Sequence, residues 1–170
     1  AAAAGPGVAK RCLRGCVVRP QAGTRTTAGS VAPRNPLGLT AFARGLEGAG
    51  YAFLLIDDSV GRAEDVRSEA FTTASFLATR TRRIGLIAAA NTSYVEPYNV
   101  SRLAASLDHV TRGRAGWLAS TGAADPAGAN YGQAAFAPDV HYVRADEILE
   151  IARRLWDSWE DDAFIRDKQS

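Results

Sequence analysis

Two kinds of apolar pattern alternate along the chain, and they predict helices and buried strands in turn. Apolar residues at helical spacing predict four helices, over about 36–48, over 69–81, from Pro97 to at least Leu107, and over 144–161. Nearly continuous apolar runs predict strands buried on both faces, over 51–57, 84–90 and 114–121. A further, earlier strand is possible around 12–18. Strands that alternate with helices in this way are typical of parallel βα units.

The same spacing predicts which side chains each helix turns towards the core. The second helix should bury Ala70, Phe71, Ala74, Leu77 and Ala78. The third should bury Val100, Leu103, Ala104 and Leu107. The last should bury Ile148, either Ile151 or Ala152, Leu155 and Trp159, with Asp146 and Glu147 at its acidic start.

Neither common nucleotide-binding loop is present, which narrows the fold class. No Gly-x-Gly-x-x-Gly follows any predicted strand, and no Gly-x-x-x-x-Gly-Lys-Ser/Thr loop occurs. We therefore predict an α/β fold, a partial TIM-type (β/α)8 barrel with roughly the first four βα units and parallel strands. Ligands of such folds bind at the carboxyl ends of the strands. Three polar triplets lie there: 57–59 (DDS), 91–93 (NTS) and 120–122 (STG).

Charge is unevenly distributed along the 170 residues, although the net charge is only +2. Seven basic residues and no acidic residue stand before Glu47, whereas the rest carries 13 basic and 18 acidic residues. We divide the chain into a basic Ala/Gly/Arg-rich leader, 1–35, which includes the possible first strand, and a barrel half, 36–170. An Arg-rich, hydroxyl-rich and acid-poor start can be a transit peptide or a polyanion-binding arm, but we favour a poorly ordered leader or the Ala/Gly/Arg bias of the whole chain.

Composition excludes several classes of protein and site. The small net charge gives no support for a nucleic-acid partner. No apolar run approaches the roughly 20 residues of a membrane helix, and no secretory h-region is present, so we expect a cytoplasmic protein. Two cysteines cannot form a disulfide framework, and two histidines supply a metal site poorly, so we expect no metal.

Several motifs, in register along the chain, carry a family resemblance. They are 53–59 (FLLIDDS), 84–98 (IGLIAAANTSYVEPY), 106–109 (SLDH), 113–117 (GRAGW), 142–147 (YVRADE) and 155–163 (LWDSWEDDA). Together they resemble the bacterial-luciferase-like flavin monooxygenases, in the branch of nitrilotriacetate monooxygenase component A, pristinamycin synthase and dibenzothiophene-sulfone monooxygenase. The resemblance covers about 36–170.

The resemblance implies a barrel that binds reduced FMN delivered by a separate NAD(P)H-dependent flavin reductase. Oxygen would add to the flavin as a hydroperoxide, which oxygenates a small organic substrate, while the protein holds the flavin and excludes water. Matched position by position, the flavin contacts are Asp58, Asn91, Thr92 and Tyr142; Thr121 and His141 complete the candidate set, and no catalytic residue is assigned. The alternatives are a helix N-cap for Asp58, a strand-end hydroxyl for Thr92 and a packing role for Tyr142.

The sequence departs from the family pattern at some positions, and family members continue beyond the last motif found in this chain. Pro138 stands where the family usually has a flavin-contacting His, and His141 lies close by in another register. A whole (β/α)8 barrel takes about 250 residues, so we expect a fragment with weak or no activity alone. Its exposed sheet edges invite pairing with a second copy. The alternative functions are a non-catalytic half-barrel assembly or binding module and an F420-dependent oxidoreductase.

Overall fold

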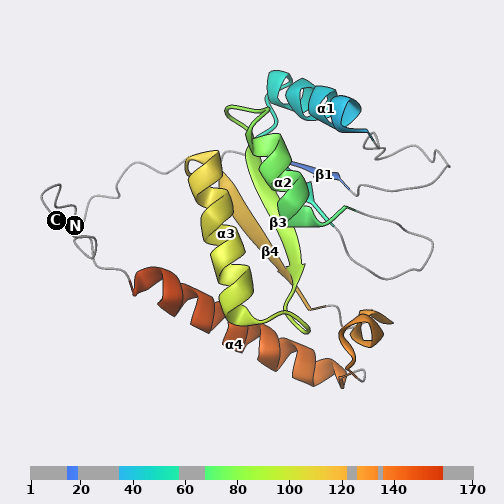
Figure 1. Ribbon diagram of the computed structural model, residues 1–170, viewed down its shortest axis with the longest axis vertical. Coiled ribbons are helices and arrows are strands. Elements are labelled where there is room, and N and C mark those ends of the chain that lie inside the picture. Colours follow the sequence, from blue (N-terminus) through green and yellow to red (C-terminus); the bar gives the residue numbers. More distant parts are fainter. Residues whose placement is uncertain (1–14, 19–34, 58–67, 122–125, 134–135, 159–170) are drawn as a thin grey trace, which may run out of the picture.

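The computed structural model describes residues 15–18, 35–57, 68–121, 126–133 and 136–158, and strands and helices alternate along them (Figure 1). The elements are β1 (Gly15–Val18), α1 (Pro36–Gly48), β2 (Phe53–Ile56), α2 (Ala70–Ala78), β3 (Gly85–Asn91), α3 (Pro97–Thr111), β4 (Ala115–Ser120), the 3-10 helix η1 (Pro126–Tyr131) and α4 (Pro138–Asp157). The predicted alternation is confirmed, including the early strand, which is present as β1. The division of the chain at residue 35 stays a prediction.

The four strands form one parallel sheet in the order β1-β2-β3-β4. Each strand pairs with its successor in the sequence, so the described sheet has no point at which the strand order reverses. A doubly wound fold has such a reversal, whereas a barrel adds its strands strictly in order. The topology therefore confirms the predicted partial barrel.

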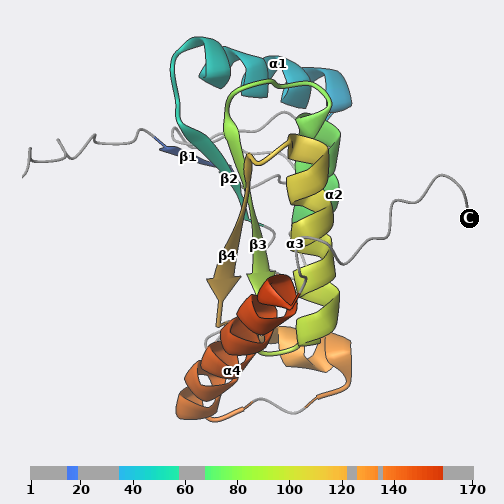
Figure 2. The same cartoon turned by 90° about the vertical axis from the view of Figure 1, so that its left-hand side faces the viewer.

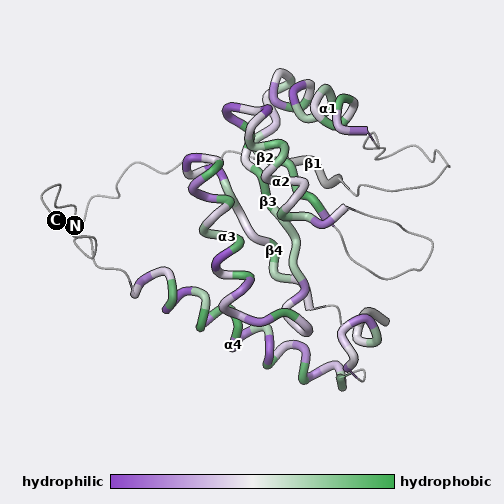
Figure 3. The backbone as a smooth tube through the Cα atoms, viewed as in Figure 1, coloured by the Kyte–Doolittle hydropathy of each residue, from purple (hydrophilic) through white to green (hydrophobic). Residues whose placement is uncertain are grey.

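The hydrophobic core lies between one face of the sheet and the helices (Figure 2). Leu54 and Ile56 of β2 are in register with Leu86 and Ala88 of β3, and all four are buried with the apolar side chains of α2 and α3. Figure 3 shows hydrophobic residues concentrated along β2 and β3, whereas hydrophilic positions recur along α3 and α4. Neighbouring positions on the strands, such as Leu55 and Leu118, are only partly buried or exposed, so the two faces of the sheet are buried unequally.

The predicted inward faces of the helices are largely confirmed. The five residues predicted for α2 are all buried, and so are Val100, Ala104 and Leu107 of α3. Leu103 is a correction, because its side chain is 49% exposed on the outer side of α3. On α4 the core position is Ala152, while Ile151 is exposed. Trp159 lies outside the described residues.

The last helix begins six residues earlier than predicted, at Pro138 rather than Arg144. Proline suits the first turn because its missing N–H has no helical partner there, and Asp139 places an acidic side chain beside the positive end of the helix dipole. Asp146 and Glu147, which were predicted to lie at the acidic start of this helix, are therefore in the middle of α4. The β-branched and aromatic residues between Pro138 and Arg144 hid the helical pattern.

A single carboxylate joins α1 to the segment that enters β3. Oε1 of Glu47 accepts hydrogen bonds from the backbone N–H groups of Arg82 (2.9 Å), Arg83 (2.5 Å) and Ile84 (3.0 Å). Burial alone raises the pKa of this carboxyl, but the three donors and the Arg83 charge outweigh it and lower the pKa below its ordinary value. Glu47 therefore acts as an anionic cap on three backbone N–H groups that no helix or strand satisfies.

Glu47→Gln should lower the free energy of unfolding at pH 7 by about 1 kcal/mol, because an amide oxygen is a weaker acceptor and the site is partly solvent-screened. A carboxyl whose folded pKa is lowered stabilises the fold above its unfolded value and stops doing so as pH falls through the folded value. The difference between the two proteins should thus shrink on acidification. Thermal unfolding at pH 7 and pH 4 measures this, with Glu147→Gln, at an exposed position of α4, as the control. A pH-independent difference would contradict the assignment.

Candidate functional site

Polar side chains gather where β3 and β4 end and α4 begins. The strands β3 and β4 run towards the same edge of the sheet, and α4 and η1 lie at that edge (Figures 1 and 2). The register pairs Asn91, the last residue of β3, with Ser120, the last residue of β4. The polar segments predicted after these two strands are therefore neighbours in space.

Ser93, which is fully buried, is the centre of this cluster. Its backbone N–H donates to Oδ1 of Asn91 (2.7 Å), which closes a local turn after β3. Its hydroxyl donates to the backbone carbonyl of Thr121, just beyond β4. The serine therefore joins the ends of the two strands.

Helix α4 holds Ser93 from the other side through two side chains one turn apart. Nδ1 of His141 lies 2.5 Å from Oγ of Ser93, and His141 is only 2% exposed. Nε of Arg144 donates to the backbone carbonyl of Ser93 (3.1 Å). Both the side chain and the backbone of Ser93 are thus fixed by the first two turns of α4.

Aromatic rings cover this polar centre. Tyr94 stacks on Tyr131 of η1 (ring centroids 5.3 Å apart) and on Phe136 (5.9 Å). The edge of His141 meets both Tyr94 (6.3 Å) and Phe136 (5.7 Å), and the guanidinium carbon of Arg144 lies 5.2 Å from the centre of the Phe136 ring. Stacked and edge-on rings of this kind exclude water from the hydrogen bonds beneath them.

Gly128 in η1 lies so close to Tyr94 that a side chain there would be crowded. A Cβ at this position would stand 3.0 Å from the Tyr94 hydroxyl and 3.1 Å from the Gln133 carbonyl. Any larger residue would therefore displace Tyr94 or η1.

Four of the six predicted site residues meet in this cluster. Asn91, Thr121 and His141 each contact Ser93, and Thr92 is their fully buried neighbour. The Thr92 hydroxyl donates to the carbonyl of Ser120 (3.1 Å). This bond is the one expected if Thr92 is a strand-end hydroxyl that joins two strands, the alternative to a flavin contact. Tyr142 points to solvent, with 61% of its surface exposed, and Asp58 lies outside the described residues. Their flavin contacts stay predictions.

Sequence reasoning did not single out the residues that organise the cluster. Ser93 was recognised only as part of a polar strand end, and Arg144 and Phe136 received no role. The signal for Arg144 was its spacing from His141, since residues three apart share a helix face. That spacing becomes informative only once the helix is known to begin at Pro138.

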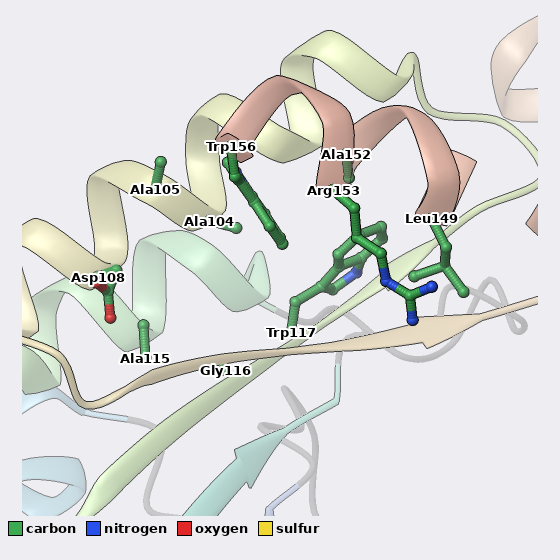
Figure 4. Close-up of a pocket in the computed structure, with 10 residues that line it drawn as sticks. All are labelled: Ala104, Ala105, Asp108, Ala115, Gly116, Trp117, Leu149, Ala152, Arg153 and Trp156. Atoms are coloured by element: carbon green, nitrogen blue, oxygen red, sulfur yellow. The ribbon is translucent and has the colours of Figure 1, made fainter. Parts of the chain in front are cut away.

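A cavity of about 520 Å³ lies apart from this cluster, between α3, β4 and α4 (Figure 4). Trp117, Leu149 and Trp156 give it a largely apolar lining, and it contains none of the predicted site residues. The Trp117 indole N–H is buried without a partner among the described residues, and the Trp156 indole instead donates to the carbonyl of Ser101 (3.1 Å). The cavity lies between the sheet and the helices. It is therefore separate from the carboxyl ends of the strands, where α/β folds bind ligands.

Comparison with known proteins decides the family. The family model described as luciferase-like monooxygenase matches residues 15–164. The chain belongs to this family. The predicted resemblance and the predicted partial TIM-type barrel are therefore both confirmed. The family match begins at the start of β1, within the segment predicted as a leader.

Individual proteins resemble the chain over most of the described fold. N-acetyl-S-(2-succino)cysteine monooxygenase of Bacillus subtilis (strain 168) is 47% identical over 105 residues, which are 61% of this chain and 24% of that protein. Nitrilotriacetate monooxygenase component A of Aminobacter aminovorans is 44% identical over 65% of this chain and 25% of that protein. The crystal structure of riboflavin lyase (RcaE), with modified FMN and riboflavin, superimposes with a TM-score of 0.76 at 32% identity, over 93% of this chain and 41% of that one.

The chain spans less than half the length of the relatives it matches. Two of these relatives are named as monooxygenases, and the third was solved with a modified FMN. Among the described residues, no helix is both long and apolar enough to cross a membrane, and no three potential metal ligands come together.

Proposed function

We propose that the chain forms the part of an FMN-dependent monooxygenase in which the ends of β3 and β4 hold one polar edge of the reduced flavin. The observation that carries this proposal is the convergence of Asn91, Thr121 and Ser93 at the ligand-binding edge of a luciferase-like fold. The reduced flavin supplies the oxygen-activating chemistry when bound, and the substrate is a small organic molecule.

The donor set of the cluster suits an uncharged, polar ring system. Within the described residues, neither the Asn91 amide nitrogen nor the Thr121 hydroxyl has a hydrogen-bond partner, and both side chains are partly accessible. Amide and hydroxyl groups match the carbonyl and ring-nitrogen edge of an isoalloxazine. Thr92 and His141 are buried and already bonded, so in this proposal they support the site rather than touch the flavin.

A separate flavin reductase is the partner that fits this function. The relative from Aminobacter aminovorans is named as one component of a monooxygenase, and the chain offers no Gly-x-Gly-x-x-Gly dinucleotide loop of its own. Reduced FMN would then arrive by transfer from an NAD(P)H-dependent enzyme, in the cytoplasm. Weak or absent activity of this chain alone stays a prediction.

Anaerobic titration of reduced FMN into the purified chain tests the proposal. We expect saturable binding, weakened about 3- to 10-fold by Asn91→Ala and by Thr121→Val, because each removes about one hydrogen bond worth 0.5–1.5 kcal/mol. Asn99→Ala, at an exposed position of α3, is the matched control and should leave the affinity unchanged.

Three outcomes would overturn the flavin proposal. No saturation at high micromolar FMN would reject it and favour a half-barrel binding or assembly module, which light scattering would then reveal as self-association. Tighter binding of F420 than of FMN would favour the hydride-transfer alternative. Equal affinities of the Asn91, Thr121 and Asn99 variants would place the flavin elsewhere on the chain.

A further inference from the structure

We propose that Ser93 holds His141 in the Nδ1–H tautomer, so that a directed series of hydrogen bonds runs from α4 through the turn after β3 to the residue after β4. In this series His141 donates to Ser93, and Ser93 donates to the Thr121 carbonyl. His141 and Ser93 are then positioning residues for the strand-end site. The inference goes beyond the proposed function, which supplies only the identity of the ligand that the site would hold.

The number of protons available to Ser93 determines which group donates in each hydrogen bond of this series. A serine hydroxyl has one proton, and a backbone carbonyl can only accept. The Ser93 hydroxyl lies in hydrogen-bonding contact with both the Thr121 carbonyl and Nδ1 of His141. If its proton pointed to the imidazole, two oxygens would face each other in a buried contact with no proton between them.

The opposite assignment satisfies both contacts. With the Ser93 proton on the Thr121 side, Oγ presents its lone pairs to His141, and Nδ1 must carry the proton that binds there. A neutral imidazole has one N–H, so Nε2 is left with the lone pair. Each bond in such a series polarises the next, and burial under Tyr94 and Phe136 strengthens both.

The remaining contacts of Ser93 explain why its orientation matters for the site. Its N–H occupies Oδ1 of Asn91, which leaves the amide NH2 group of Asn91 as the part of that side chain free to donate to a ligand. Arg144 fixes the Ser93 carbonyl, so the backbone cannot rotate to compensate for a lost side-chain bond. Ser93 thereby makes Asn91 a donor and ties Thr121 in place beside it.

Nitrogen NMR of the ligand-free chain tests the tautomer. In ¹⁵N-labelled protein near pH 8, well above the ordinary histidine pKa of about 6.5, long-range ¹H–¹⁵N spectra distinguish a protonated from an unprotonated ring nitrogen. The chain has two histidines, and His109, exposed on α3, is the internal control; His109→Gln identifies its signals. We expect a protonated Nδ1 and an unprotonated Nε2 for His141 in the wild-type chain. A protonated Nε2 would overturn the proposal.

Two serine variants separate positioning from general packing. Ser93→Ala removes the acceptor, so His141 should lose its preference for the Nδ1–H form, whereas Ser93→Thr retains the hydroxyl and should preserve it. An unchanged tautomer in Ser93→Ala would show that the serine does not fix the ring, and would reject the proposal. Should either variant fail to fold, the wild-type spectrum still shows whether His141 donates to Ser93 or accepts from it. A failure to bind FMN would reject the proposed function and leave this tautomer assignment intact.

Discussion

Arg114→Lys should lower the free energy of unfolding by about 2–3 kcal/mol, because the planar guanidinium holds several carbonyls that a single ammonium cannot reach together. Nη1 of Arg114 donates to the Ile84 carbonyl (2.7 Å), and Nε to the Thr111 carbonyl (2.9 Å). Nη2 reaches the carbonyls of Ala78 and Thr81 at the end of α2, both at 3.3 Å. One side chain thus donates hydrogen bonds to carbonyls at the ends of α2 and α3 and just before β3.

The measurement is chemical denaturation of the two proteins, supported by thermal unfolding. For a domain of this size the loss corresponds to about 4–12 °C in Tm. Arg102→Lys, at an exposed position of α3, is the matched control and should change stability by less than about 0.5 kcal/mol. If both substitutions had the same small effect, the guanidinium bonds of Arg114 would contribute nothing that an ammonium does not.

Arg114 also shows how a family motif can be recognised without being understood. The sequence GRAGW supported the resemblance, yet nothing in it indicated that the arginine binds carbonyls of residues about 30 positions earlier. Glu47 is a similar case, since its backbone partners lie 35 to 37 residues away. Contacts of this kind depend on the packing of α1 and α2 against the sheet, which no local pattern contains.

Local patterns of apolar residues were sufficient to predict the order of the strands and α-helices and the topology of the sheet. Buried strands such as β3 have apolar residues at nearly every position, and helices such as α2 have them every third or fourth residue, so the strands and the α-helices could be identified from the sequence. Their order then restricted the topology to parallel units. The 3-10 helix η1 was not predicted. Leu103 was predicted wrongly because the spacing of an apolar stripe leaves its exact centre uncertain by one position. The start of α4 was predicted wrongly because the β-branched and aromatic residues after Pro138 hid the helical pattern.

The candidate site could be located from the sequence but not assembled. The rule that ligands bind at the carboxyl ends of strands pointed to the segments after β3 and β4, and these do lie together. Which side chain occupies the centre depends on α4, whose first turns bring His141 and Arg144 onto Ser93. Homology alone would have treated His141 as a displaced flavin ligand, whereas its burial gives it a supporting role in the proposed site.

Leu86→Ala should lower the free energy of unfolding by about 3 kcal/mol, whereas Leu118→Ala should lower it by less than about 1 kcal/mol. Leu86 lies in the core between the sheet and the helices and is fully buried. Leu118, on the adjacent strand, pairs with Ala89 on the opposite face and is 42% exposed. The same three heavy atoms are removed in both variants, so the difference in stability reports how far each face of the sheet is covered.

This pair of leucines tests what covers the second face of the sheet in solution. In a closed barrel that face is the packed interior, and a leucine there costs as much to truncate as one beneath the helices. Denaturation of both variants, at two protein concentrations, measures the two losses. Equal losses would contradict the prediction and show that Leu118 is covered. If the Leu118→Ala loss then grew with protein concentration, the cover would be a second copy of the chain, because only association makes stability depend on concentration.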